Sequence, residues 1–229
     1  MQMADWKENC NEKSTDSSES CKKEVKYMSK LLISGGHGGS DPGACGNGLN
    51  ERDYCSEFID RVRWVLDNCF NYRSPFKHIK VPNGSDANSD VNGAVTFVNN
   101  NYLSGENTLA IDYHLNASSN QKARGWEILC HTNTKSNEMA NRLAKLLQPV
   151  YSKLEMPFRG VKCGNDFGFI GRTKPTAFIF ELAFVTNPYE AKTLKGKDSS
   201  ESLVYSHARA LLNTLGVQYE IKTGSKEML

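Results

Sequence analysis

The sequence lacks any long apolar run: no stretch of its 229 residues approaches the roughly 20 consecutive apolar residues that span a bilayer. A mean hydropathy of −0.55 agrees, and we exclude a transmembrane protein. The sequence also lacks an excess of charge of either sign, since 28 Lys and Arg against 26 Asp and Glu leave a net charge of +2. A dedicated nucleic-acid-binding protein concentrates far more positive charge, so nucleic acid is not an expected partner.

No Cys-x-x-Cys pair is present, which argues against a zinc site built from four cysteines. The seven cysteines are an odd number, so a complete disulfide framework within one chain is excluded. The N-terminal residues also lack the apolar segment of a secretory signal peptide, because acids and lysines occur throughout residues 1–24. We therefore expect a protein that is made in the cytoplasm and reaches any outside substrate by a route that reads no signal.

The apolar pattern divides the chain into a central domain, residues 30–216, and two polar ends. Residues 1–29 are serine-rich and charged and are expected to form a disordered tail or linker, and residues 217–229 a short polar tail. Within the central domain, short apolar runs typical of strands alternate with helical periodicity, which predicts one α/β domain with a mostly parallel twisted sheet and helices on both faces. The expected strands are residues 31–34, 76–81, 108–113, 125–131 and 176–184, and the expected helices begin near residues 50, 91, 136 and 198.

Capping residues mark three of the expected helix starts. Asn50 suits the N-cap position of the first helix. Ser136 is the expected cap of the third helix, and Asp198 with Glu201 is the expected capping box of the last. Gly216 would then end the last helix.

Four polar residues stand at informative positions in this pattern. His37 directly follows the first strand within a run of glycines, and His114 directly follows the strand of residues 108–113. Glu51 opens the first helix, and Glu181 lies within the apolar segment of residues 176–184. Sites in open α/β sheets form at the carboxyl ends of strands, where His37 and His114 both fall. Two imidazoles and one carboxylate with an open fourth position are what a catalytic zinc site needs.

Each of these residues also has a purely structural interpretation, and spacing alone leaves both interpretations open. A histidine at a strand end is often a hydrogen-bonded structural residue, and a glutamate at a helix start often complements the helix dipole. Glu181 is harder to explain this way, because an acid that faces a core is costly to bury unless a cation pairs with it. The remaining histidines considered, His78, His131 and His207, are expected to be structural or surface residues, with His131 the one that ends an expected strand.

Three segments resemble the signatures of one enzyme family. ISGGHGGSDPGACGNGLNERD, residues 33–53, is similar to the first signature of zinc-dependent N-acetylmuramoyl-L-alanine amidases of the amidase-3 type. DYHLNASSN, residues 112–120, resembles the family's S-x-H-x-N-A segment, and PTAFIFELAFVTNPYEAKTL, residues 175–194, resembles its P-A-v-L-v-E-x-G-F segment. The similarity runs from about residue 31 to residue 215, and the departures at Tyr113 and Ala183 touch no ligand position.

The resemblance implies a specific chemistry. His37, Glu51 and His114 would bind one Zn²⁺, and Glu181 would be the catalytic acid/base. The partner would be peptidoglycan, cleaved at the amide between the lactyl group of N-acetylmuramic acid and L-alanine. Asn116 and Arg172 are candidates for holding the substrate or the developing oxyanion, with a supporting or surface hydrogen bond as the alternative for each.

Two alternatives remain open at this stage. The first is a zinc peptidase that acts on the stem peptide, and the second is an amidase-like module that binds peptidoglycan without cutting it. The context of the domain is also open: it suits either the catalytic domain of a longer protein or a small phage-type lysin that acts on the cell wall.

Overall fold

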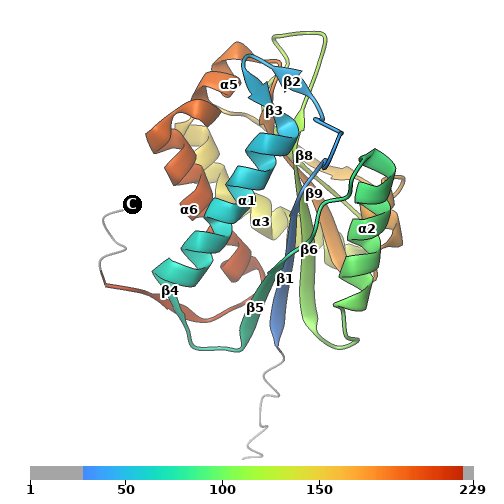
Figure 1. Ribbon diagram of the computed structural model, residues 1–229. Coiled ribbons are helices and arrows are strands. Elements are labelled where there is room, and N and C mark those ends of the chain that lie inside the picture. The colour runs from blue at the N-terminus through green and yellow to red at the C-terminus, as the bar shows by residue number, and fades with distance from the viewer. Residues whose placement is uncertain (1–27, 224–229) are drawn as a thin grey trace, which may run out of the picture.

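The computed structural model describes residues 28–223, which form a central sheet between two layers of helices (Figure 1). The tail expected for residues 1–29 lies almost wholly outside the described residues, and β1 (Ser29–Gly35) already begins at its end. None of the helices in the described range is long and apolar enough to cross a membrane.

The main sheet has six strands in the order β5-β1-β6-β9-β7-β8. Four neighbouring strands run parallel: β5 (Phe76–Lys80), β1, β6 (Asn107–Asn116) and β9 (Thr176–Phe184). The fifth, β7 (Trp126–Cys130), is antiparallel to β9, and the edge strand β8 (Phe158–Cys163) is parallel to β7. The predicted α/β domain with a mostly parallel sheet is therefore confirmed, whereas β8 was not expected and β7 runs against the majority.

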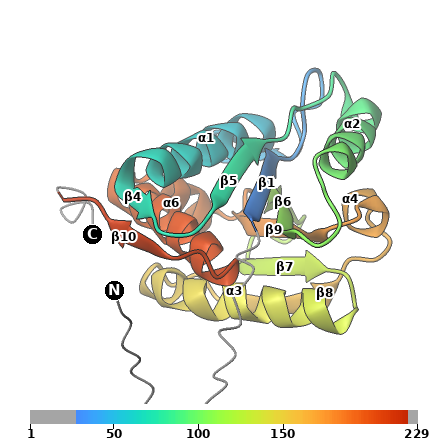
Figure 2. The same cartoon turned by 90° about the horizontal axis from the view of Figure 1, so that it is seen from below.

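The helices cover both faces of the sheet, as predicted. Helices α1 (Glu51–Cys69), α3 (Thr134–Lys153) and α6 (Lys197–Thr214) lie together on one side, and α2 (Ala87–Asn100) lies with the short α4 (Gly168–Arg172) on the other (Figure 2). A further helix, α5 (Pro188–Lys195), directly precedes α6.

Alternate residues of β6 divide between the two layers. Ile111, Tyr113 and Leu115 belong to the large hydrophobic cluster that includes residues of α1, α3 and α6. Ala110 belongs to the smaller cluster on the α2 and α4 side. Because side chains alternate along a strand, the residues that follow Ala110 on its face are Asp112, His114 and Asn116. The polar residues of β6 therefore lie on the α2 and α4 side of the sheet, above the smaller apolar cluster.

Two of the three predicted helix caps are wrong. Asn50 does cap α1, where its side chain accepts a hydrogen bond from Asp53 N. Helix α3 is instead capped by Asn133, which accepts from Ser136 N, so Ser136 lies inside the first turn. Helix α6 follows α5 after a single residue, Gly196, and has no side-chain cap, so the capping box expected at its start does not form.

The expectation of a polar C-terminal tail is wrong for residues 217–221. Val217 is only 5% exposed, and β10 (Tyr219–Ile221) pairs antiparallel with β4 (Phe70–Tyr72), which directly follows α1. The apolar alternation of Val217, Tyr219 and Ile221 is the physical reason. Residues 224–229 lie outside the described range.

Candidate metal centre and active site

Glycines let the loop after β1 pass close to the predicted ligands. Gly36 N donates a hydrogen bond to Tyr113 O, and a Cβ on Gly36 would lie 2.0 Å from His114 Cε1. Gly43 adopts a left-handed backbone (φ +65°), and a Cβ there would lie 2.6 Å from Glu51 Oε2. This loop also contains the two-stranded hairpin of β2 (Cys45–Gly46) and β3 (Leu49–Asn50), which leads into α1. The close approach at both positions requires glycine.

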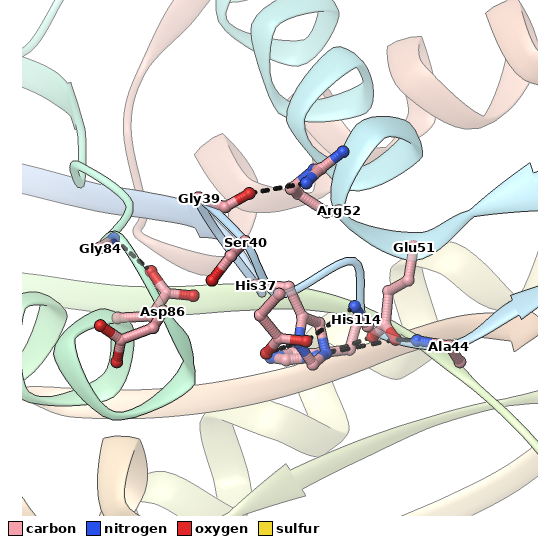
Figure 3. Close-up of polar contacts among 12 residues, drawn as sticks. His37, Gly39, Ser40, Ala44, Glu51, Arg52, Gly84, Asp86 and His114 are labelled. Atoms are coloured by element: carbon pink, nitrogen blue, oxygen red, sulfur yellow. Dashed lines mark hydrogen bonds and ion pairs between the residues drawn. The ribbon is translucent and has the colours of Figure 1, made fainter.

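The structure brings His37, Glu51 and His114 together. Glu51 reaches from the start of α1 to the two imidazoles (Figure 3): Oε2 lies 3.2 Å from His37 Nε2, and Oε1 lies 2.9 Å from His114 Nδ1. One ligand atom from each residue lies within 4.8 Å of the others, a spacing that could hold a metal ion. Two imidazole nitrogens and a carboxylate form the donor set of a catalytic zinc site.

The second ring nitrogen of each histidine is held by a carboxylate. Asp41 Oδ2 lies 2.7 Å from His37 Nδ1, and Asp112 Oδ2 lies 3.1 Å from His114 Nε2. Ser34 Oγ donates to the other oxygen of Asp112, at 2.7 Å. Such contacts fix the tautomer and the ring orientation of a metal-bound histidine, leaving His37 Nε2 and His114 Nδ1 to face the centre.

The charges around the cluster favour a cation. The hydrogen bond to Glu51 raises the pKa of His37 to about 9, although burial opposes the shift. Burial also opposes the shift at His114, but the Asp112 and Glu51 carboxylates raise its pKa well above the ordinary value. Burial would raise the pKa of Glu51, yet hydrogen bonds from both histidines lower it. In the absence of a metal, protons on the two imidazoles balance the negative charge of the carboxylates. A zinc ion would replace these protons, so the residues present fit zinc.

Glu181 lies beside this cluster on β9, directly opposite His114 on β6. Burial raises the pKa of Glu181 to about 7, and its buried Oε2 has no hydrogen-bond partner among the described residues. A carboxyl group with a pKa near neutrality can both take up and release a proton, which is what a general acid/base does.

A cleft of about 150 Å³ opens between α2, α4 and the sheet and reaches the cluster. His37 and His114 are among the residues that line it. Asp90, Asp112 and the half-exposed Phe167 are among its other lining residues.

The two residues predicted to contact substrate have partners elsewhere. Asn116, at the end of β6, donates through Nδ2 to Glu127 Oε1 at 3.1 Å. Arg172 ends α4 and donates through Nη1 to Asn92 Oδ1 at 2.7 Å, which ties α4 to α2 outside the cleft lining. A substrate contact by either residue stays a prediction.

The other histidines lie away from the cluster, in agreement with the structural interpretation. His78 pairs with Asp67, 2.9 Å away, and His207 is fully buried between the hydroxyls of Tyr113 and Tyr151. His131 follows β7 and lies near the N-terminal end of β9, away from the cluster, because β7 runs antiparallel to β9.

Sequence reasoning missed Asp41 and Asp112, the carboxylates that hold the two imidazoles. The signal for Asp112 was available, since it lies two residues before His114 and must share its face of the strand. Asp41 lies only four residues after His37, but nothing in the sequence shows that the loop folds back on the ring.

Residues 31–213 match the family described as N-acetylmuramoyl-L-alanine amidase (Amidase_3). The chain belongs to this family. It is 32% identical over 187 residues to the germination-specific N-acetylmuramoyl-L-alanine amidase of Bacillus subtilis, covering 77% of this chain and 75% of that protein. It is 24% identical over 196 residues to an endolysin of Bacillus phage SPP1, covering 83% and 68%.

Solved structures show the same fold. The catalytic domain of CwlV, an N-acetylmuramoyl-L-alanine amidase from Bacillus (Paenibacillus) polymyxa var. colistinus, superposes with a TM-score of 0.69 at 22% identity, over 83% of this chain and 100% of that one. The family membership makes this chain a hydrolase of the N-acetylmuramoyl-L-alanine amidase class, acting on an amide of peptidoglycan.

Proposed function

We propose that this amidase is zinc-dependent and hydrolyses the amide between the lactyl group of N-acetylmuramic acid and L-alanine at the site formed by His37, Glu51, His114 and Glu181. One observation carries the proposal: three ligand atoms within 4.8 Å of one another lie beside Glu181, whose buried Oε2 has no hydrogen-bond partner among residues 28–223. A closed structural site would have a fourth protein ligand instead of an acid/base at this place.

The protein side of the reaction follows from this arrangement. A zinc ion at the site would polarise the amide carbonyl and acidify water. Glu181 Oε2 takes a proton from the attacking water and later delivers it to the departing nitrogen of L-alanine, so that it ends the cycle as it began. Its raised pKa suits this exchange near neutral pH. Asp41 and Asp112 keep both imidazoles oriented throughout.

The two alternatives differ from this proposal in what is cleaved. A binding module has no use for a carboxylate whose buried oxygen lacks a partner in the described part of the chain, so the position of Glu181 argues against it. A zinc peptidase would release fragments of the stem peptide and leave the lactyl amide intact. Mass spectrometry of fragments from purified peptidoglycan separates the two enzymes, and cell-wall lysis is the setting we propose for the activity.

The test compares four proteins: the parent, Glu181→Gln, His114→Ala and the control His131→Ala. We expect Glu181→Gln to keep bound zinc and peptidoglycan binding but to lose at least roughly 10²- to 10⁴-fold in turnover, because only the proton acceptor is gone. His114→Ala should lose zinc and activity together. His131→Ala, at the opposite sheet edge, is the control and should match the parent.

Three results would count against the proposal. Full hydrolysis by Glu181→Gln would remove the assigned role of Glu181. Loss of zinc from the same variant would make Glu181 a fourth ligand. An active parent that contains no transition metal by elemental analysis would refute zinc dependence.

A further inference from the structure

A second charged cluster lies next to the site on strands β7 and β8. Glu127 of β7 has a side chain that is only 8% exposed, and its Oε2 accepts hydrogen bonds from Arg159 Nε at 2.7 Å and from Lys162 Nζ. Its other oxygen accepts from Asn116 at the end of β6. A buried carboxylate therefore holds two cations of β8 in fixed positions.

The cluster carries more positive than negative charge and has donors to spare. One carboxylate faces two cations, whose side chains are 35% (Arg159) and 41% (Lys162) exposed. Arg159 Nη1 donates to Arg124 O at 3.5 Å, Nη2 has no partner among the described residues, and the guanidinium carbon lies 4.8 Å from the centroid of the Phe184 ring. A rigid guanidinium with unused N–H groups is suited to bind a carboxylate.

The position of Glu127 sets the distance from the reacting bond. Glu127 lies directly opposite Glu181, which in turn lies directly opposite His114. Neighbouring strands are about 4.8 Å apart, so the backbone of Glu127 lies about 10 Å from that of His114, on the far side of Glu181.

The opposite flank of the site has the reverse charge. Asp41, Asp90 and Asp112 line the cleft between α2 and α4, with Phe167 at the same cleft. Carboxylates and an aromatic ring suit an uncharged sugar and would repel an acid. A substrate with a sugar on one side of its scissile bond and an acidic peptide on the other therefore has one favourable orientation here.

On the basis of the proposed function, we propose that Arg159 and Lys162 form a subsite for the free carboxylate of the second residue of the stem peptide. The first residue, L-alanine, follows the scissile bond, and a second-residue glutamate linked through its γ-carboxyl leaves its α-carboxylate free. Two extended residues span about 7 Å, most of the roughly 10 Å between the backbones of His114 and Glu127. The side chains of Arg159 and Lys162 extend from β8 to Glu127 and shorten the remaining distance. Amidation of that carboxylate removes the charge, so the subsite distinguishes acidic from amidated peptidoglycan.

The experiment compares two probes, N-acetylmuramoyl-L-alanyl-D-glutamate and its α-amide, with the zinc-loaded full chain. We expect the acid to have a kcat/KM about tenfold or more above that of the amide, mainly through KM, and the difference to shrink at high salt. Equal kcat/KM values for the two probes would refute the subsite. A parent that cleaves neither probe nor purified peptidoglycan would refute the proposed function itself.

Variants locate the discrimination. In Arg159→Gln/Lys162→Met, the kcat/KM for the acid should fall to that for the amide, while the value for the amide stays unchanged. If the double variant does not fold, Arg159→Lys replaces it, because it keeps a cation beside Glu127. This variant should lose part of the preference for the acid over the amide. Lys80→Met is the matched control, because Lys80 is also a strand lysine with an acidic partner, Asp60. An equal loss for both probes would show a structural role and overturn the proposal.

Discussion

Asp112→Asn tests whether the carboxylate behind His114 prepares the metal site. The substitution keeps the size of the side chain and removes its charge. If the Asn oxygen keeps the hydrogen bond from Ser34 Oγ, its NH₂ group faces His114 Nε2. Nε2 must then accept, which moves the ring proton to Nδ1, the nitrogen that faces Glu51 and the metal position.

The expected cost follows from this contact. Loss of an outer partner of a metal-bound histidine typically lowers metal affinity 10- to 100-fold, or about 1.4–2.7 kcal/mol. The amide introduced at position 112 could instead turn its oxygen toward His114 Nε2. The ring proton would then stay on Nε2 and leave Nδ1 free for the metal, although the negative charge is lost. We therefore expect a loss of zinc affinity near the lower end of this range. Ser34→Ala leaves Asp112 charged and bonded to His114, so its zinc affinity should stay within about threefold of the parent.

Zinc affinity measured by competition with a chromogenic chelator gives this result without any assay of activity. Thermal melting of the metal-free proteins shows whether the fold is kept, and ¹⁵N chemical shifts of His114 report its tautomer. Unchanged zinc affinity in Asp112→Asn, with the fold intact, would refute the argument that Asp112 prepares His114. An equal loss in Ser34→Ala would assign the effect to packing.

Three further predictions use other parts of the fold. Gly36→Ala should lose zinc, because its Cβ would lie 2.0 Å from His114 Cε1, whereas Gly93→Ala, with nothing within 4 Å, should bind zinc normally. Burial lowers the pKa of His207 from 6.5 to about 3, so its contribution to stability is full above pH 6.5 and is lost as the pH falls toward 3. Between pH 7 and 5 the parent should lose about 2 kcal/mol more unfolding free energy than His207→Asn in denaturant titrations. A chain ending at residue 216 should melt at a lower temperature, because it lacks β10 and the buried Val217.

The sequence was sufficient for the residues whose position follows from strand direction. His37 and His114 each come directly after or at the end of a parallel strand, and such ends meet at one edge of the sheet. Glu181 stands out in the sequence because an acid within an apolar strand needs a reason to be there, and its catalytic role stays a prediction. The cap at Asn50 could also be predicted, since it depends on residues that are neighbours in sequence.

Features that depend on distant contacts could not be predicted. Strand β8 has no buried residue, so its sequence shows no apolar alternation, and it forms by pairing with β7. Asn133 displaces Ser136 as the cap of α3 although both residue types cap helices well. Asp41 is one of three acids within four residues of a histidine, and only the folded loop shows that it holds the ring.

Strand β7 runs antiparallel to β9, and β8 follows the direction of β7. The residues next to Glu181 therefore lie near the N-terminal ends of β7 and β8. The rule that sites gather at carboxyl ends would place His131, which follows β7, beside Glu181. Because β7 is antiparallel to β9, its second residue, Glu127, takes that place, and His131 lies at the far edge. Strand β8 follows the direction of β7, so Arg159 near its start comes to the same edge. The change of strand direction between β9 and β7 thus divides the site. The imidazoles and their carboxylates come from β6, the loop after β1 and the start of α1, and the paired cations come from β8, which runs in the reversed direction.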